Sequence, residues 1–271
     1  MKKIKIVNIL LIIIIIILFC IAVNSLIHII NWKKDNNKTD DELNIIKNNS
    51  EIKEVVDNEK TEIINNEEIP KSDPYWDYIK MNMIDADFNN LKEINSDVKG
   101  WIYVPNTNIN YPFVQYKNNS YYLNRSFEKK KSEAGWIFAD YRNDLTNFDK
   151  NTIIYGHNRL NKTMFGSLKD ATSKKWLNNK DNHIIKLSTE KENTLWQVFS
   201  LYKIETTDDY LYINFNNETE YTNFIKLIKN RSMYNFKSTV TSNDKILTLS
   251  TCNGSKQKLV MHAKLIKTQQ R

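Results

Sequence analysis

The stretch Thr248-Leu-Ser-Thr-Cys252-Asn-Gly254 decides the fold class of this 271-residue chain. It closes a run of β-forming residues that starts at Ile246, and a glycine follows the cysteine after one residue. This pattern predicts a strand over residues 246–252 that ends at a turn. The cysteine is then presented at the rim of a β-structure, either as a reactive thiol or as a half-buried residue at a strand end.

Seven other short runs of β-forming residues surround this stretch. Turn signals such as Pro105-Asn106 and Asn143-Asp144 separate them. The predicted strands cover residues 101–104, 111–114, 136–138, 152–155, 183–187, 195–202 and 259–266. So many short strands in one domain predict a closed barrel or a sandwich, a mostly β fold.

Two helices accompany the predicted strands. Apolar residues at helical spacing between Trp76 and Leu91 predict one helix on the outside of the domain. A second helix starts after Asn217, a capping residue with Glu220 three positions on, and falls directly before the cysteine strand. Its apolar face is made by Tyr221, Phe224, Leu227 and Ile228.

The N-terminal segment has the length of a membrane span. Apolar character runs from Ile6 to Ile30, after Lys2, Lys3 and Lys5, and Trp32 takes the place of an interfacial aromatic. A cleaved signal peptide would need a small-x-small site, which this segment does not offer. We therefore expect an uncleaved anchor with a cytoplasmic N-terminus and an extracellular domain, although Lys33 and Lys34 oppose that orientation.

Composition then divides the chain into three parts. Residues 1–32 are the predicted transmembrane signal anchor, residues 33–73 a polar linker, and residues 74–271 a globular domain. The net charge is +7, with lysines scattered among acids, which indicates a solvated basic surface suited to an anionic membrane or cell wall and no nucleic-acid partner. The two cysteines, Cys20 and Cys252, lie on either side of the linker, so we expect no disulfide, and no Cys/His spacing predicts a metal site.

A histidine follows a second strand end in Tyr155-Gly-His157-Asn158. Histidine titrates near neutrality and can accept or deliver a proton, while the alternative is a structural or simply exposed ring. Of the other histidines, His28 lies in the apolar segment, and we expect His183 and His262 to be packing or surface residues.

Together these segments resemble the class B sortases. The sortase cysteine motif is similar to residues 248–252, and the histidine region is similar to residues 155–158 followed by 163–166. Further resemblance lies, in the family's order, in residues 98–104, 135–143 and 259–265. The resemblance implies an eight-stranded sortase-type β-barrel with an N-terminal helix and one helix inserted before the cysteine strand, preceded by a transmembrane helix.

The resemblance also implies a reaction. Cys252 would attack the Thr carbonyl of a C-terminal sorting signal, similar to NPQTN, NPxTG or PPxTG, in a secreted protein, and form a thioacyl enzyme. An amine of peptidoglycan or of a pilin would resolve it. His157 would protonate the leaving amine and deprotonate the incoming one, with no metal or cofactor. The alternatives are a pilin-polymerising sortase, a thiol peptidase, and a catalytically impaired scaffold on the same fold.

The chain departs from the family at one position. Sortases carry an arginine on the last strand, and here Lys258 occupies the matching place. Because lysine offers a compact ammonium and not a planar fork, it can serve an oxyanion only with different geometry. Lys256, Arg142 and Arg159 are rivals for the role. Supporting roles for substrate or oxyanion are assigned to Thr251 and Asn158, a structural pair to Asp140 and Arg142, and an exposed turn to Asp208 and Asp209.

Overall fold

The chain forms two compact units, Met1–Asn44 and Ile45–Arg271. The computed structural model describes residues 2–64, 69–253 and 256–271, and of residues 2–6, Cys252 and Asn253 it describes the backbone alone. The predicted turn glycine, Gly254, and the Cys252 side chain therefore lie outside the described residues.

The first unit is helical. Helix α1 spans Lys2–Asn48, and from Val7 on it is long and apolar enough to cross a membrane. It continues past residue 32, the predicted end of the anchor, into the polar segment predicted as a linker. Between Trp32 and Asn48 the sequence contains no proline or glycine, so nothing in it stops the helix.

The rest of the predicted linker differs from the prediction, because it pairs with the folded domain. Strand β1, Ile52–Val55, runs antiparallel to β3, Met83–Ala86, and β2, Thr61–Ile63, runs antiparallel to the last strand, β11, Gln257–Gln270. Few apolar residues are needed here, because main-chain hydrogen bonds attach these strands. The folded domain thus begins well before residue 74.

An ion pair fastens this N-terminal strap, residues 51–64, to the barrel. The side chain of Lys267 on β11 is fully buried, and its ammonium lies 2.8 Å from a carboxylate oxygen of Asp57. The same ammonium donates to the carbonyl oxygen of Met81 at 2.7 Å. A buried lysine needs such partners, because an unpaired charge away from water is costly.

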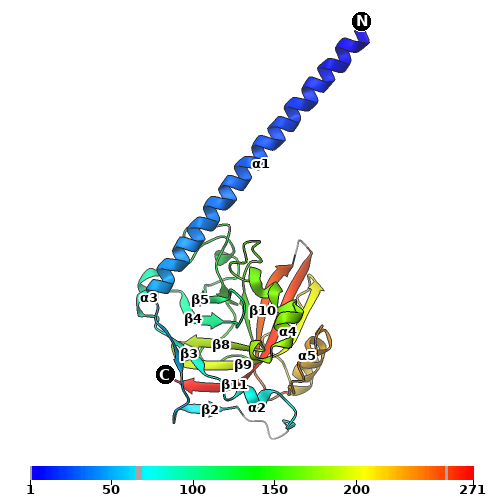
Figure 1. Cartoon of the computed structure of the whole chain (residues 1–271). Helices are drawn as coiled ribbons and strands as arrows, with labels where there is room; N and C mark the ends of the chain where they lie inside the picture. The colour runs from blue at the N-terminus through cyan, green and yellow to red at the C-terminus, as the bar shows by residue number, and fades with distance from the viewer. Residues whose placement is uncertain (1, 65–68, 254–255) are drawn as a thin grey trace. The chain divides into compact units, whose positions relative to one another are not determined.

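Eight strands close into a barrel (Figure 1). Their order is β10-β7-β6-β5-β4-β8-β9-β11, and β11 returns to pair with β10. All eight predicted strands are present and the predicted barrel is confirmed. The remaining barrel strands are β4 Val98–Tyr103, β5 Asn110–Val114, β6 Phe138–Ala139, β7 Asn151–Tyr155, β8 Ile184–Thr189, β9 Glu192–Glu205 and β10 Ile246–Asn253.

The helices agree with the prediction only in part. The single helix predicted between residues 76 and 91 is wrong, because this stretch holds two short helices with β3 between them, and pairing with β1 outweighs the helical spacing. They are α2, Tyr75–Tyr78, and α3, Asn89–Ile94. The other short elements are α4 Lys174–Asn178 and the 3₁₀ turns η1 Tyr121–Leu123, η2 Gly166–Thr172 and η3 Lys180–Asn182.

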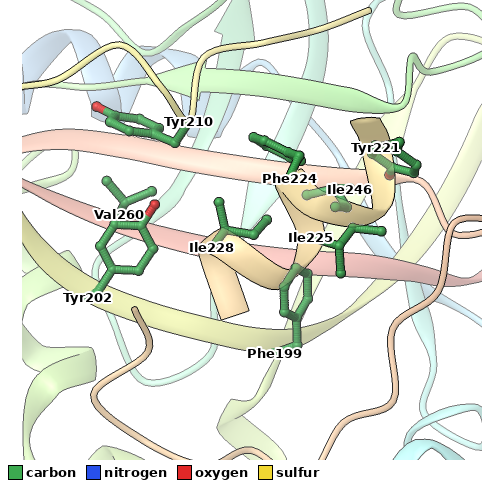
Figure 2. Packing of buried hydrophobic residues seen from close by; sticks show 9 residues of the cluster. All are labelled: Phe199, Tyr202, Tyr210, Tyr221, Phe224, Ile225, Ile228, Ile246 and Val260. Carbon is green, nitrogen blue, oxygen red and sulfur yellow. The ribbon is translucent and has the colours of Figure 1, made fainter. Parts of the chain in front are cut away.

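The late helix, α5 (Glu218–Asn230), is confirmed together with its cap. The Asn217 side chain accepts a hydrogen bond from the backbone N–H of Glu220. The helix packs its apolar face on β9, β10 and β11 (Figure 2). Burial of each such side chain stabilises the fold by roughly 1.5–3 kcal/mol. The cluster comprises Phe199, Tyr202, Tyr210, Tyr221, Phe224, Ile225, Ile228, Ile246 and Val260.

Candidate active site

Strands β7 and β10 bring the two predicted catalytic residues to one end of the barrel. They run parallel, with Tyr155 opposite Ser250, and the N–H of Gly156 donates to the Ser250 carbonyl at 3.3 Å. His157 and Cys252 each follow two residues after this last pair. Because neighbouring parallel strands end at the same edge of a sheet, about 4.8 Å apart, the segments that carry the two residues continue from the same edge of the barrel.

A pocket of about 310 Å³ opens at this edge. It contains three of the predicted site residues, His157, Thr251 and Lys258, which come from three different strands or strand ends. Its described lining is completed by Asn119, Leu123, Phe138, Tyr155, Gly156, Thr206, Thr207, Asp208, Tyr210, Leu211 and Ser250.

The His157 ring is half-buried and held from one side. Its Nε2 lies 2.6 Å from the carbonyl oxygen of Leu123. Because a carbonyl only accepts, Nε2 carries the hydrogen of this bond, and Nδ1 is the ring atom left for proton exchange. Among the described residues, Nδ1 has no hydrogen-bond partner.

Gly135 makes room for this ring. It has φ +60°, and a Cβ placed on it would lie 2.8 Å from Cδ2 of His157 and 2.7 Å from the Leu123 carbonyl oxygen. Both the left-handed backbone and the close approach require glycine. The position of the His157 ring therefore depends on a glycine at residue 135.

Lys258 is half-exposed and is the lysine of the predicted set that lines the pocket. On β11 it lies opposite Cys252 of β10 on one side and Ile204 of β9 on the other. Its rival Lys256 is exposed, and its carbonyl accepts from the backbone N–H of Thr206 at 3.0 Å. Neither Arg142 nor Arg159 is among the described lining residues.

Thr251 is 3% exposed and lines the pocket. Its Oγ1 has no hydrogen-bond partner within the described part of the chain, which is costly for a buried hydroxyl. A ligand in the pocket could satisfy it. Asn158 lies outside the described lining, and its backbone bridges to Met164 across the loop after His157.

The other histidines of the folded domain are packing residues, as expected. Burial lowers the pKa of His183 to about 4 and that of His262 to about 3, so both are neutral. Thr248 donates to Oδ1 of Asn151 and therefore accepts from Nδ1–H of His262, while the Tyr202 hydroxyl donates to Nε2. This leaves His157 as the histidine at the pocket.

The two acids after β9 have separate positions. Asp209 forms a bidentate pair with Arg231, at 2.7 and 2.6 Å. Asp208 is exposed and lines the pocket beside Thr206 and Thr207. Sequence reasoning assigned both to a turn and missed that one of them faces the site, because no motif marks this loop.

Proton transfer and anion stabilisation can both occur at this site. A histidine, an ammonium and a hydroxyl converge where the cysteine strand ends, and within the described part of the chain one ring nitrogen and the hydroxyl have no hydrogen-bond partner. Nucleophilic catalysis at a carbonyl needs groups of these kinds. Among the described residues, no group of three or more His, Cys, Asp or Glu could hold a metal ion.

The fold is a closed eight-stranded barrel, and its pocket lies at the edge where the strand that carries the cysteine ends. A sequence model of the Sortase domain matches residues 102–266, and the chain belongs to the sortase family. It is 39% identical over 184 residues to Sortase B of Staphylococcus aureus, which covers 66% of this chain and 75% of that protein. It is 35% identical over 186 residues to Sortase B of Listeria monocytogenes, covering 66% and 74% of the two chains.

The solved structures agree. The Staphylococcus aureus sortase B–substrate complex superposes with a TM-score of 0.63 and 38% identity, over 66% of this chain and 84% of that one. The predicted resemblance to class B sortases is therefore confirmed, and with it the general reaction class, peptide transfer by a sortase.

Proposed function

We propose that this protein is a class B sortase that cleaves a C-terminal sorting signal through a Cys252 thioacyl intermediate and transfers the protein to an amine of the cell wall. One observation carries the proposal: His157, Thr251 and Lys258 line one pocket at the edge where the strand bearing Cys252 ends. A lysine or histidine without a role in the reaction could lie anywhere on the barrel, whereas these two line the same pocket as the cysteine strand.

The first half-reaction forms the thioester. The Cys252 sulfur, as thiolate, attacks the Thr carbonyl carbon of an NPQTN-, NPxTG- or PPxTG-like signal, and the carbonyl oxygen becomes an oxyanion. Lys258 and the Thr251 hydroxyl are the groups that would donate to this oxyanion, and one such donor typically contributes ~3–4 kcal/mol. When the C–N bond breaks, the leaving amine takes a proton from His157.

The second half-reaction transfers the acyl group. A peptidoglycan amine loses its proton to His157 and attacks the thioester carbon. The C–S bond breaks, the new amide forms, and the Cys252 thiolate returns. Asn158 contributes by fixing the loop that follows His157, through its bridge to Met164.

The membrane placement follows the same proposal. Residues 1–32 hold the protein in the membrane with the N-terminus in the cytoplasm, and the catalytic domain faces the cell wall. Its substrates are then exported proteins that reach the same surface. The net charge of +7 favours approach to an anionic wall.

The decisive assay uses a quenched fluorescent peptide with a sorting signal and the full chain in detergent. Wild type should cleave it, while Cys252→Ala and His157→Ala should fall to background. Cleavage that survives Cys252→Ala would refute the thioacyl mechanism. A folded wild type that cleaves none of the three signal types would support a scaffold.

Adding an amine separates the remaining alternatives. A transpeptidase converts triglycine or a lysine-bearing pilin peptide into a ligated product, detectable by mass spectrometry. Ligation to triglycine alone supports wall anchoring, whereas ligation to the pilin lysine alone supports polymerisation. Hydrolysed peptide as the sole product would identify a thiol peptidase.

A further inference from the structure

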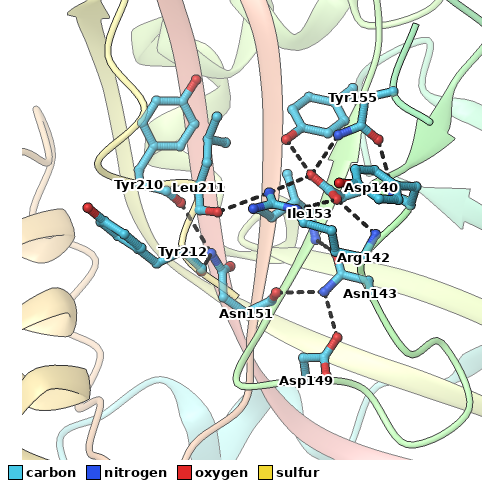
Figure 3. A network of polar contacts seen from close by, with 12 residues as sticks. Asp140, Arg142, Asn143, Asp149, Asn151, Ile153, Tyr155, Tyr210, Leu211 and Tyr212 are labelled. Atoms are coloured by element: carbon cyan, nitrogen blue, oxygen red, sulfur yellow. Dashed lines mark hydrogen bonds and ion pairs between the residues drawn. The ribbon is translucent and has the colours of Figure 1, made fainter. Parts of the chain in front are cut away.

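A buried carboxylate outside the proposed mechanism connects the walls of the pocket. Asp140, directly after β6, is fully buried. Its Oδ1 accepts from the backbone N–H and from Nε of Arg142, at 3.0 and 2.9 Å. Its Oδ2 accepts from Arg142 Nη2 at 2.8 Å and from the Tyr155 hydroxyl at 2.9 Å (Figure 3). It also accepts from Asn119 Nδ2 at 2.9 Å. Five donors satisfy the acceptor capacity of one carboxylate.

The donors connect Asp140 to three separate segments that line the pocket, two of them directly and one through Arg142. Asn119 and Tyr155 are lining residues themselves. Arg142 extends the network to a third wall, because its Nη2 also donates to the carbonyl oxygen of Leu211, at 3.2 Å. One carboxylate therefore joins the loop after β5, the end of β7 and the loop between β9 and α5.

Each wall residue is held in a single orientation. Asn119 gives Nδ2 to Asp140, and its Oδ1 accepts from the backbone N–H of Tyr141 at 3.0 Å, so its amide cannot turn. The Tyr155 ring packs against Phe138, with ring centroids 5.2 Å apart, while its hydroxyl is committed to Asp140. Tyr155 also stands two residues before His157.

A second route reaches the same loop. Nδ2 of Asn143 donates to the carbonyl oxygen of Asn151 at 2.9 Å. Nδ2 of Asn151 in turn donates to the carbonyl oxygens of Tyr210 and Tyr212, at 3.2 and 2.8 Å (Figure 3). The backbone N–H of Asn143 donates to the backbone carbonyl oxygen of Asp140 at 3.1 Å, which connects this second route to Asp140.

We propose that Asp140 is a positioning residue, which sets the shape of the peptide-binding pocket by holding Asn119, Tyr155 and the Leu211 loop through one buried carboxylate. The part that concerns the peptide rests on the proposed function. Asp140 touches no substrate. It acts through the residues that do, so its loss weakens peptide binding more than it slows the chemical step.

The charge is essential to this role. Burial opposes ionisation of Asp140, but hydrogen bonds from Arg142, Tyr155 and Asn119 outweigh it, and the pKa of the carboxyl stays below its usual value. All five hydrogen-bonding groups around Asp140 are donors. In Asp140→Asn the side-chain NH₂ would face some of these donors without an acceptor between them, and the Arg142 charge would lose its counter-charge.

The test is Asp140→Asn in the full chain, with two readouts. Against a sorting-signal peptide, KM should rise about tenfold or more while kcat changes less than about threefold, since hydrogen bonds to charged groups of this kind are each worth roughly a factor of ten. Amide hydrogen exchange should accelerate in residues 117–123 and 206–212. Tyr155→Phe, which deletes only the hydroxyl, should raise KM by about threefold, and Asp140→Asn should add less on that background than in wild type.

Asp73→Asn is the matched control. Asp73 is 4% exposed, and its carboxylate accepts from the backbone N–H groups of Tyr75 and Thr239 and from Nε2 of Gln197. It lies outside the described pocket lining, so this variant should lose stability and keep the wild-type KM.

The outcomes separate the two proposals. Asp140→Asn with unchanged KM, or with exchange in both segments as slow as in wild type, overturns the role of Asp140. If wild type cleaves no sorting peptide, the proposed function fails, and hydrogen exchange still decides whether Asp140 holds the walls. If Asp140→Asn does not fold, Tyr155→Phe decides, because an unchanged KM in that variant contradicts the proposal.

Discussion

Gly135 and the His157 ring share a space that admits no Cβ: such an atom would stand 2.8 Å from Cδ2 of the imidazole. The contact joins the segment before β6 to the loop after β7. It lies at the same edge of the ring as the hydrogen bond from Nε2 to the Leu123 carbonyl, because Cδ2 is bonded to Nε2 and the Gly135 Cβ would also stand 2.7 Å from that carbonyl oxygen.

We therefore expect Gly135→Ala to displace the ring and lower kcat/KM for a sorting-signal peptide about 100-fold, since a misplacement of about 1 Å can cost that much. Gly100→Ala is the control, because a Cβ there would lie 2.6 Å from the Phe113 ring and from the Ser188 carbonyl, which are not among the described pocket residues. That variant should lose stability while its folded fraction keeps its activity. Equal losses of activity in both variants would contradict the role of Gly135.

Lys258→Ala should lower kcat by about 100- to 1,000-fold while thermal unfolding stays near that of wild type, because the ammonium is proposed to stabilise the oxyanion and the residue is half-exposed. Steady-state kinetics and calorimetry measure the two quantities. Lys258→Arg should retain activity, since its guanidinium also donates. Lys256→Ala should be neutral, and a larger effect there than at Lys258 would transfer the role to Lys256.

Thr251→Val removes the buried hydroxyl that has no partner among the described residues and preserves the shape of the side chain. Stability should stay the same or rise by up to about 1 kcal/mol, because an unsatisfied polar group is lost, while kcat falls about tenfold or more. Thr152→Val is a close match. Its Oγ1 is equally buried and unpartnered, but Thr152 is not a described lining residue. If both variants keep full activity, Thr251 has no part in the reaction.

Acid should destabilise the folded domain through its two buried histidines. The pKa of His262 is lowered by burial to about 3 and that of His183 to about 4, against 6.5 in the unfolded chain. Below pH 6.5 these two histidines are therefore protonated in the unfolded state and remain neutral in the folded state. The free energy of unfolding should fall by up to about 1.4 kcal/mol per pH unit for each ring between pH 6.5 and 4.

Urea unfolding at several pH values measures this slope. His262→Gln keeps one donor and one acceptor for Thr248 and Tyr202. Its free energy of unfolding should therefore depend less steeply on pH than that of wild type, by up to the contribution of one bound proton, about 1.4 kcal/mol per pH unit. In proton NMR, the His262 ring signals should not titrate between pH 8 and 5. A titrating signal would contradict the buried neutral ring.

The N-terminal strap should contribute measurably to stability. A fragment that starts at Ile69 keeps Asp73 but lacks β1, β2 and Asp57, so it exposes the edge of β11 and leaves Lys267 without its carboxylate. We expect it to be less stable than a fragment that starts at Ile45 by about 3 kcal/mol or more. Asp57→Asn in the longer fragment should account for about 1–3 kcal/mol of this difference. Equal urea midpoints for the two fragments would show that the strap is dispensable.

The barrel was predictable because its strands carry their own signals. Apolar β-branched runs and turn residues mark all eight strands, and the Asn217 cap marks α5. The strap was missed because main-chain pairing and the ion pairs of Glu54 and Asp57 hold it, and neither leaves a periodic apolar pattern. Helical spacing between Trp76 and Leu91 was misleading for the same reason, since β3 exists through its partner β1.

The site was predictable only where the chain gives a motif. His157, Thr251 and Lys258 were placed by strand ends and by family resemblance. Asn119, Asp208 and Leu211 come from loops whose approach to the pocket depends on Asp140, Arg142 and Asn151. Such contacts are set by the closed barrel and not by local sequence, so no window of residues reveals them.

Strand β10 is bonded to β7 on one side and to β11 on the other, and this arrangement has a consequence for when the protein can become active. The histidine lies 95 positions before the cysteine in the printed sequence, and the lysine comes six positions after it. Because a chain is synthesised from its N-terminus, the histidine, the cysteine and the lysine come together only once β11, the last strand of the barrel, has paired with β10. Until then the pocket at this edge lacks Lys258, so the assembly of the proposed reactive groups is timed by the folding of the barrel itself.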